Sequence, residues 1–264
     1  MPQALSPKTP GFPFIELRSV DSTNNYARSL LNDAENAGPQ SEISDGTTIF
    51  AREQYAGKGQ RGNEWSSSPG ENIAMSIIWK PGPLPLSRQF FLSALVALSV
   101  HEVFKKYAGN DTAIKWPNDL YWQDRKAGGI LIESVIKTSE DQAVWNWAII
   151  GIGININQTM FPSWLPNPVS LKQITGKEHD PIALAHEICE TLGRNYGQFI
   201  KEGSEIFLER YNQVLYRKDQ LSRFKKENRV FEARIKGVNA EGKLMLEHGL
   251  LEEFSFGEIQ FAGH

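Results

Sequence analysis

The residues best suited to chemistry begin at Gly57-Lys58-Gly59-Gln60-Arg61-Gly62, where three glycines alternate with two cations and an amide. Glycine lets backbone amides approach a bound group closely, and lysine and arginine neutralise negative charge. The stretch therefore predicts a loop that closes over an anion such as phosphate. The plainer alternative is a glycine-rich hairpin loop that binds nothing.

The same loop matches G-x-G-x-x-G, the pattern of dinucleotide-binding turns. Such a turn needs a strand before it, a helix directly after it and an acidic residue about 20 positions further on. The run 47–52 predicts the strand, but residues 64–70 are turn-forming and the positions near Trp79 hold no acid. The Lys-Ser/Thr that ends a P-loop is missing too, so the sequence argues against both nucleotide-binding folds.

A lysine, an amide and a carboxylate emerge together in Lys115-Trp116-Pro117-Asn118-Asp119, where the proline ends a predicted strand. A scaffold that fixes polar groups at a strand end, and a loop that exposes them, suit the lining of a pocket. An ordinary Asn-Asp turn after proline is the alternative.

Lys126 lies just before Gly128 and Gly129 at the start of another predicted strand. Glycines there remove side chains where a ligand or another backbone comes close. Lys126 would direct a compact positive charge at that space, although a solvated surface lysine is the common alternative.

Two further segments carry polar groups that a ligand could use. Gly151-Ile152-Gly153-Ile154-Asn155 places alternate glycines in an apolar strand, which predicts a flat ligand on that face with Asn155 bonded to it. Ser22-Thr23-Asn24 offers two hydroxyls and an amide at a predicted helix start. Helix capping accounts for one of them, and the others could bind a polar ring or a carboxylate.

Composition narrows the class of protein. The 264 residues carry a formal net charge of -3, whereas domains that mainly hold nucleic acid are usually strongly basic. Cys189 is the single cysteine, so no intramolecular disulfide is possible, and its apolar helical surroundings predict a buried structural thiol. Because neither a secretory signal nor a run of membrane-spanning length is found, we expect a cytoplasmic protein without a membrane contact.

Periodicity predicts an α+β domain over residues 1–218, followed by a small β domain over residues 219–264. The first domain is expected to contain strands over 14–17, 47–52, 73–79, 112–116, 130–136 and 143–155. Helices are expected after the cap Ser22, after the cap Ser87 to about Tyr107, from Pro181 after the cap Asp180, and from Ser204 to about Tyr216. Residues 156–180 are expected to form a loop.

In this order, the motifs resemble those of biotin protein ligases. The resemblance spans about residues 14–260 and also includes Glu53-Gln54 before the glycine loop and Trp65 after it. Its most specific part is Lys-Trp-Pro-Asn-Asp with the downstream run Lys126-Ala127-Gly128-Gly129-Ile130-Leu131. It implies a mixed sheet flanked by helices, similar to class II aminoacyl-tRNA synthetases, and a C-terminal SH3-like β-barrel.

The resemblance also implies an activity. Enzymes of this family join biotin and ATP, with Mg²⁺, into biotinyl-5'-AMP, and then transfer biotin to one lysine of a biotin carboxyl carrier protein. Members that act as repressors carry an N-terminal helix-turn-helix. Only residues 1–13 precede the first predicted strand, so we expect that module to be absent and predict no specific DNA binding.

Roles for single residues follow from the resemblance. Because biotin's carboxylate attacks the α-phosphate of ATP although both are anions, cations must offset the repulsion. Lys126 is expected to bridge the two groups, and Lys58 and Arg61 to clamp phosphates as further catalytic residues. The biotin site is expected to comprise Ser22, Thr23, Asn24, Gln54, Gly57, Gly59, Gln60, Lys126, Gly128 and Gly129. The ATP and adenylate site is expected to comprise Lys58, Arg61, Trp65, Lys115, Asn118, Asp119 and Asn155, with Asp119 as a Mg²⁺ ligand. Ile130 and Ile132 are expected to form an apolar wall.

The glycine loop departs from the family's Gly-Arg-Gly-Arg-x-Gly-Arg pattern, because Lys58, Gln60 and Asn63 replace three arginines. Arginine offers phosphate a planar fork of donors, and lysine offers only a point charge. We therefore hypothesise that this loop releases biotinyl-AMP faster than the loops of arginine-rich relatives.

Two alternative functions and one possible mode of assembly remain open. A lipoate or octanoyl ligase of the same fold usually carries Arg-Arg-x-x-Gly-Gly-Gly-x-Val-x-His-Asp, and no such run occurs. A non-catalytic adaptor would not be expected to retain Lys115, Asn118, Asp119 and Lys126. The strand over 143–154 could be a sheet edge that pairs with a second copy in a homodimer. None of the five histidines has metal-ligand spacing, so we predict no structural metal.

Overall fold

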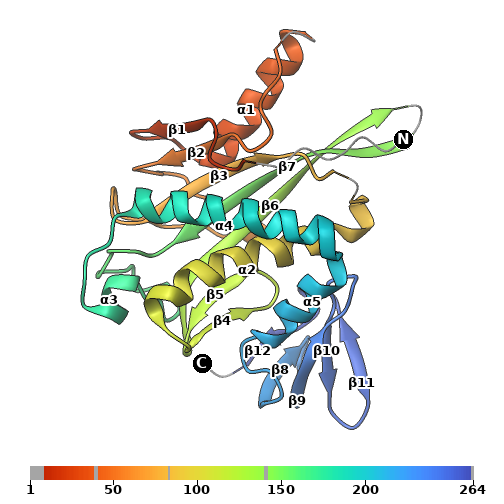
Figure 1. The fold of residues 1–264 in the computed structure, drawn as a ribbon. Coiled ribbons are helices and arrows are strands. Elements are labelled where there is room, and N and C mark those ends of the chain that lie inside the picture. Colours follow the sequence, from red (N-terminus) through yellow and green to blue (C-terminus); the bar gives the residue numbers. More distant parts are fainter. Residues whose placement is uncertain (1–8, 39–40, 83, 140–141, 263–264) are drawn as a thin grey trace.

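The computed structural model describes residues 9–38, 41–82, 84–139 and 142–262, and it contains a large sheet and a small one (Figure 1). The large sheet is mixed, because β1 and β2 are parallel while the other neighbours are antiparallel. Its seven strands, in spatial order, are β1 (Phe14–Leu17), β2 (Thr48–Ala51), β3 (Ile73–Trp79), β7 (Gln142–Ile154), β6 (Arg125–Ser139), β5 (Asp119–Trp122) and β4 (Thr112–Lys115).

Two long helices, α2 (Gln89–Ala108) and α4 (Pro181–Glu202), cover one face of this sheet (Figure 1). Helix α2 is apolar around most of its surface because it packs between the sheet, α4 and α5 (Ser204–Gln213). The expected cap and proline at the start of α4 are confirmed, since Asp180 Oδ1 accepts hydrogen bonds from the amides of Ile182 and Ala183.

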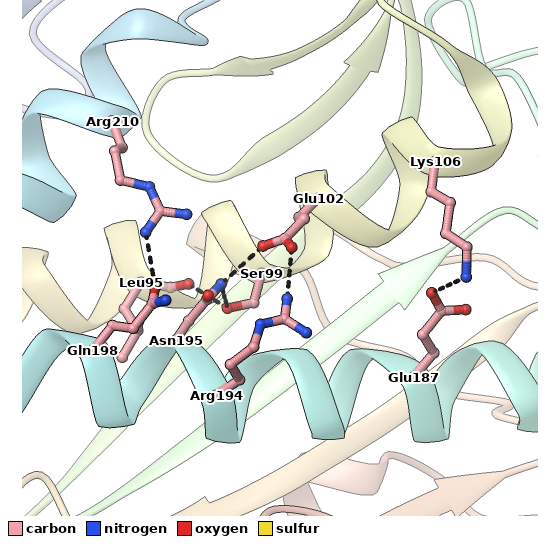
Figure 2. A network of polar contacts seen from close by, with 9 residues as sticks. All are labelled: Leu95, Ser99, Glu102, Lys106, Glu187, Arg194, Asn195, Gln198 and Arg210. Atoms are coloured by element: carbon pink, nitrogen blue, oxygen red, sulfur yellow. Dashed lines mark hydrogen bonds and ion pairs between the residues drawn. The ribbon is translucent and has the colours of Figure 1, made fainter.

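A polar seam fixes the register of α2 against α4 (Figure 2). The amide of Asn195 is 1% exposed and donates to Ser99 Oγ at 3.1 Å and to Glu102 at 3.3 Å. Arg194 pairs with the same glutamate, and Lys106 pairs with Glu187 at 2.7 Å. Buried polar groups are costly unless they are bonded, so these contacts disfavour a shifted packing of the two helices.

The opposite face of the sheet is covered at one end by α1 (Thr23–Asn36), whose Ala27 and Leu31 pack on apolar side chains of β2, β3 and β7. Further along, residues on β3, β7 and β6 are aligned across the sheet. Ser76 is opposite Gly151, which is opposite Leu131, and Ala74, Gly153 and Gly129 are aligned in the same way. Opposite residues of antiparallel strands share a face. Because several of these residues are glycines, which have no side chains, this part of the sheet surface forms a depression.

The small sheet consists of five strands in the order β11 (Leu251–Phe254), β10 (Leu244–Glu247), β9 (Arg229–Val238), β8 (Leu221–Lys226) and β12 (Gln260–Phe261). It is fastened to the rest of the chain by hydrogen bonds. Asn212 of α5 exchanges two bonds with the backbone of Val238, and Trp116 Nε1 donates to the carbonyl oxygen of Gly242 at 2.9 Å. The division at residues 218 and 219 stays a prediction.

Three expectations about elements need correction. Strand β7 is not an edge over Ala148–Ile154, because this part pairs with β3 on one side and with β6 on the other, whereas the pairing of residues 142–147 is with β6. A short helix, α3 (Leu171–Thr175), interrupts the expected loop over 156–180, and a capping box between Ser170 and Gln173 starts it. The N-cap of helix α2 is Arg88 rather than the expected Ser87, because a 3₁₀ turn over Leu86–Arg88 precedes the helix. Among the described residues, no helix is both long and apolar enough to cross a lipid bilayer.

Candidate active site

A cavity of about 210 Å³ opens on the glycine-lined face and is lined by most of the residues that the sequence predicts. The predicted residues on its wall are Ser22, Thr23, Asn24, Gln54, Lys58, Gly59, Gln60, Trp65, Asn118, Asp119, Lys126, Gly129 and Ile130. Residues that were not predicted complete the wall, chiefly Asn63, Glu64, Met75, Trp116, Leu131, Ile152 and Phe256. Segments far apart in the sequence therefore meet at one place.

One end of the cavity is polar and tightly bonded. Gln54 Oε1 accepts from the backbone amide of Thr23 at 2.8 Å and lies 3.1 Å from the Thr23 hydroxyl, which donates to it. The hydroxyl of Ser76 lies 2.7 Å from Thr23 Oγ1 and 2.6 Å from Asn24 Oδ1. The amide of Asn24 donates to Glu133 at 2.8 Å. Since each side chain has a bonded partner, the network presents a fixed set of polar atoms to a ligand.

The alternate glycines of β7 make room for protein side chains. A Cβ at Gly151 would overlap Asn24 Oδ1, and a Cβ at Gly153 would overlap the Trp65 ring. Both glycines line the cavity, so the flat ligand that we expected on this face stays a prediction. The glycines also let Asn24 and Trp65 lie close to the sheet as walls of the cavity.

Two polar atoms at the wall have no hydrogen-bond partner within the described part of the chain. They are Trp65 Nε1, a donor, and Gln60 Oε1, an acceptor. Buried polar atoms are seldom left unpaired in native proteins. An unpaired donor and an unpaired acceptor at the same cavity therefore favour a polar ligand there.

The cationic centre of the cavity is Lys126, whose Nζ lies 2.7 Å from Asp119 Oδ1. Its backbone is also held, because Lys126 donates to the carbonyl of Asn167 and accepts from the amide of Val169. Asn118 Nδ2 donates to the carbonyl oxygen of Ile130, so the Asn-Asp pair is held close to β6. This arrangement can hold an anion beside a charged, positioned ammonium group.

The glycine loop forms the outer wall of the cavity. It is closed on itself by bonds from Trp65 N to Gly57 O at 2.9 Å and from Gly59 N to Asn63 O at 2.7 Å. Lys58 Nζ donates to Asn25 Oδ1 of α1. A hydrogen bond from the Asn25 amide, helped by the charge of Lys58, lowers the pKa of Asp21 below its ordinary value. The lysine is thus tied to the helix end that also supplies Thr23 and Asn24.

Several predicted residues do not line the cavity. Lys115 Nζ lies 4.6 Å from the ring centres of Tyr121 and Phe261 and donates to the Tyr121 hydroxyl at 3.1 Å. Burial lowers the pKa of Lys115. Asn155 is buried and donates to Val169 O at 3.2 Å, so it supports the backbone around Lys126 rather than a ligand.

Arg61 does not line the cavity either, and its guanidinium group contacts the wall residue Phe256 of the small-sheet segment. Gly57 and Gly128, two more predicted residues that do not line the cavity, lie where the backbone packs closely. A Cβ at Gly57 would meet Gln54 and the carbonyl of Trp65, and a Cβ at Gly128 would lie 2.8 Å from the carbonyl of Gly153. Ile132 packs against the main core instead of forming the cavity wall.

Among the residues that the sequence reasoning missed, three differ in how clearly the sequence signals them. Ser76 could have been found, because it is a lone hydroxyl in an apolar strand. Glu133 has a weaker signal, as an acid within β6. Phe256 has none, since nothing in the sequence around it indicates that the small sheet reaches the cavity.

Two other sequence expectations concern the cysteine and metal binding. The thiol of Cys189 is buried, and burial raises its pKa to about 11, which agrees with a structural thiol. In the described ranges, no group of three or more His, Cys, Asp or Glu side chains is arranged to hold a metal ion.

Residues 17–155, more than half of the chain, match the family described as the Biotin/lipoate A/B protein ligase family. The chain belongs to this family. Among curated members of the ligase family, it is 30% identical to the bifunctional ligase/repressor BirA of Escherichia coli over 91% of this chain and 71% of that protein. It is 34% identical to the biotin–[acetyl-CoA-carboxylase] ligase of Paracoccus denitrificans over 62% of this chain and 65% of that protein.

The ligase-family fold is also found among solved structures. The biotin protein ligase from Aquifex aeolicus in complex with biotin and ATP superposes with a TM-score of 0.74 at 24% identity, covering 94% of this chain and 97% of that chain. The α+β architecture with a mixed sheet, flanking helices and a C-terminal sheet is therefore confirmed.

Proposed function

We propose that this member of the ligase family makes biotinyl-5'-AMP from biotin and ATP, and transfers biotin to a lysine of a biotin carboxyl carrier protein. Relatives named as biotin–[acetyl-CoA-carboxylase] ligases support this assignment over a lipoate or octanoyl ligase. The single observation that carries it is the position of Lys126. Its ammonium group lies in one cavity with the polar network of Thr23 and Gln54 and with the strand-end pair Asn118 and Asp119.

Biotin fits the cavity by the chemistry of its parts. The neutral ureido ring needs hydrogen-bond donors and acceptors in fixed positions, which Thr23, Asn24 and Gln54 supply. The thioether ring and the valeryl chain need an apolar wall, which Met75, Ile130 and Ile152 supply. The carboxylate then reaches towards Lys126.

The first step forms a bond between a biotin carboxylate oxygen and the α-phosphorus of ATP, while the bond to pyrophosphate breaks. Lys126 is placed to offset the repulsion between the two anions and the charge that develops between them. Asn118 and Trp65 lie on the same wall and are the proposed contacts of the adenylate. In the second step, the amine of the acceptor lysine attacks the biotinyl carbonyl, AMP leaves and the amine loses a proton.

Mg²⁺ would accompany ATP and neutralise phosphate charge. Such an ion is usually held by one or two carboxylates together with substrate phosphates and water. Asp119 fits this requirement as a carboxylate on the cavity wall, and its bond to Lys126 places it beside the proposed α-phosphate position. We therefore propose Asp119 as the protein ligand of Mg²⁺.

Closure of the glycine loop would keep water from the mixed anhydride, which water hydrolyses readily. Lys58 is placed on the cavity wall and is the proposed phosphate contact from this loop. A cytoplasmic setting, a homodimer and the absence of specific DNA binding stay predictions.

A thermal-shift screen with matched ligands tests the function. Biotin together with ATP and Mg²⁺ should raise the melting temperature, because a ligand that binds only the folded state stabilises it. Lipoate with ATP and Mg²⁺ should not. A higher melting temperature with lipoate, ATP and Mg²⁺ but not with biotin, ATP and Mg²⁺ would favour the lipoate ligase. An unchanged melting temperature with both acids would favour the adaptor.

A further inference from the structure

Arg61 joins the glycine loop to the small sheet across 195 positions of sequence. Its Nη2 donates to the carbonyl oxygen of Phe256 at 2.9 Å, and its guanidinium carbon lies 4.7 Å from the centre of the Phe256 ring. Phe256 follows β11 and precedes β12. Thus the single arginine of the glycine loop makes a charge-assisted hydrogen bond and a cation–π contact to one residue of the small-sheet segment.

The small-sheet segment has a niche shaped for this guanidinium group. Gly257 has a φ of +90°, and a Cβ at this position would overlap the guanidinium of Arg61. Arg61 itself has a φ of 56°, in the left-handed region that costs free energy for residues other than glycine. A non-glycine residue keeps such a backbone only when its surroundings hold it, and here the niche provides the contacts.

Phe256 connects this niche to the cavity. It lines the cavity wall, and its ring meets the ring of Trp116 edge-on, with centres 5.8 Å apart and planes at 79°. Trp116 is held in turn by its bond to the carbonyl of Gly242. One aromatic side chain therefore contacts the glycine loop, the Lys-Trp-Pro-Asn-Asp motif and the ligand space.

We propose that Arg61 and Phe256 form a latch that fastens the glycine loop to the small sheet and sets how long the reaction intermediate stays bound. The inference rests on the proposed function, because the retained molecule is biotinyl-AMP. In this account the small sheet closes the active site, and Arg61 is a positioning residue rather than a phosphate clamp. A latch acts on release of the intermediate and a phosphate clamp acts on its synthesis, so the two roles predict different kinetics.

Gly257→Ala tests the latch without changing either partner, because the new methyl group fills the niche. Gly249→Ala is the matched control, since Gly249 has a φ of +98° in the same small sheet but nothing within 4 Å of its Cβ position. We expect Gly257→Ala to release biotinyl-AMP roughly tenfold faster than wild type, the change that about 1.4 kcal/mol of lost contact produces. Gly249→Ala should release it at the wild-type rate.

A double variant separates the latch from the phosphate clamp. Arg61→Ala should also speed release, and adding Gly257→Ala should speed it no further, because both changes remove the same contact. If Arg61→Ala slows adenylate synthesis without speeding release, or if the two effects multiply, the latch is contradicted and Arg61 acts on phosphate.

Amide hydrogen exchange of residues 57–63 in the ligand-free protein gives a readout that needs no activity. The latch predicts faster exchange in Gly257→Ala and Arg61→Ala than in wild type and Gly249→Ala. If the wild-type protein makes no biotinyl-AMP, the proposed function fails, while this comparison still tests the latch. Equal exchange in Gly257→Ala and Gly249→Ala would overturn it.

Discussion

Lys126 Nζ lies 2.7 Å from Asp119 Oδ1, across the neighbouring strands β6 and β5. A β-bulge between Leu120 and Tyr121 shifts the register by one residue, so that Gly129 rather than Gly128 is opposite Asp119. A Cβ at Gly129 would lie 3.4 Å from the carboxylate and 3.6 Å from the ammonium group. Because glycine has no side chain, residue 129 does not cover the Lys126–Asp119 pair, and the two charged groups stay accessible to a ligand.

Gly151→Ala should weaken biotin binding. The added methyl group would overlap Asn24 Oδ1 and displace the amide from Ser76 and Glu133. Overpacking of this kind costs about 1–3 kcal/mol, so we expect affinity for biotin to fall by roughly 10- to 100-fold. Isothermal titration with biotin alone measures it.

Gly197→Ala is the control for this change, because nothing lies within 4 Å of the Gly197 Cβ position on α4. It should leave biotin affinity unchanged and raise the free energy of unfolding by about 0.5–1 kcal/mol, as glycine does when replaced by alanine within a helix. Wild-type biotin affinity in Gly151→Ala would show that Asn24 does not contribute to the ligand site.

Gln60→Arg should slow the release of biotinyl-AMP. Gln60 is on the cavity wall, and its Oε1 has no partner in the described part of the chain. An arginine there would add a planar, charged donor, and bonds to charged groups contribute about 1.5–3 kcal/mol. Release should therefore slow at least tenfold in a rapid-dilution assay with radiolabelled adenylate.

Gln60→Lys adds a positive charge without the planar set of donors that a guanidinium group has. It should therefore slow the release of biotinyl-AMP less than Gln60→Arg does. If neither variant differs from wild type, the loss of arginines in this loop has no effect on adenylate retention.

The stability of the fold should fall below about pH 6.5 because of His101. Burial lowers the pKa of this imidazole from its ordinary 6.5, partly offset by a hydrogen bond to the carbonyl of Thr112. Above pH 6.5 the ring is neutral in both states, so it adds no pH dependence. As the pH falls towards the folded-state pKa, the unfolded chain binds a proton that the folded chain does not, which costs up to about 1.4 kcal/mol per pH unit.

Urea unfolding of wild type and His101→Gln at several pH values between 5 and 7.5 measures this contribution. The variant should have a flatter profile than wild type between pH 5 and 6.5. Parallel profiles for wild type and His101→Gln would contradict the assignment.

The sequence predicted the order of the elements well because their signals are local. Apolar strands, the cap and proline before α4, and the apolar surface of α2 all act within a few residues. The same is true of the site motifs, whose glycines and charges are adjacent in sequence. What remained hidden depends on pairing between distant segments, such as the place of β7 inside the sheet and the bulge beside Asp119.

The differences between the predicted site residues and the residues that line the cavity have the same origin. Lys115 and Asn118 are three positions apart in one motif, yet Asn118 lines the cavity and Lys115 is surrounded by aromatic rings. The residue type and position of Arg61 predict a phosphate ligand, but its guanidinium group lies in the space that Gly257 leaves open. Residue type and spacing predict which side chains can do chemistry, and tertiary contacts decide which of them face the ligand.

The central claim is that Lys126 bridges biotin's carboxylate and the α-phosphate of ATP. Biotin-dependent pyrophosphate release by Lys126→Ala and wild type, with Lys137→Ala as a surface-lysine control, tests it most directly. We predict that Lys126→Ala loses at least about 100-fold in rate, as expected when about 2.7 kcal/mol of transition-state stabilisation is removed. It should keep an unchanged circular dichroism spectrum, because its part-exposed ion pair contributes about 0–1 kcal/mol to stability. A folded Lys126→Ala protein that releases pyrophosphate at the wild-type rate would contradict the account.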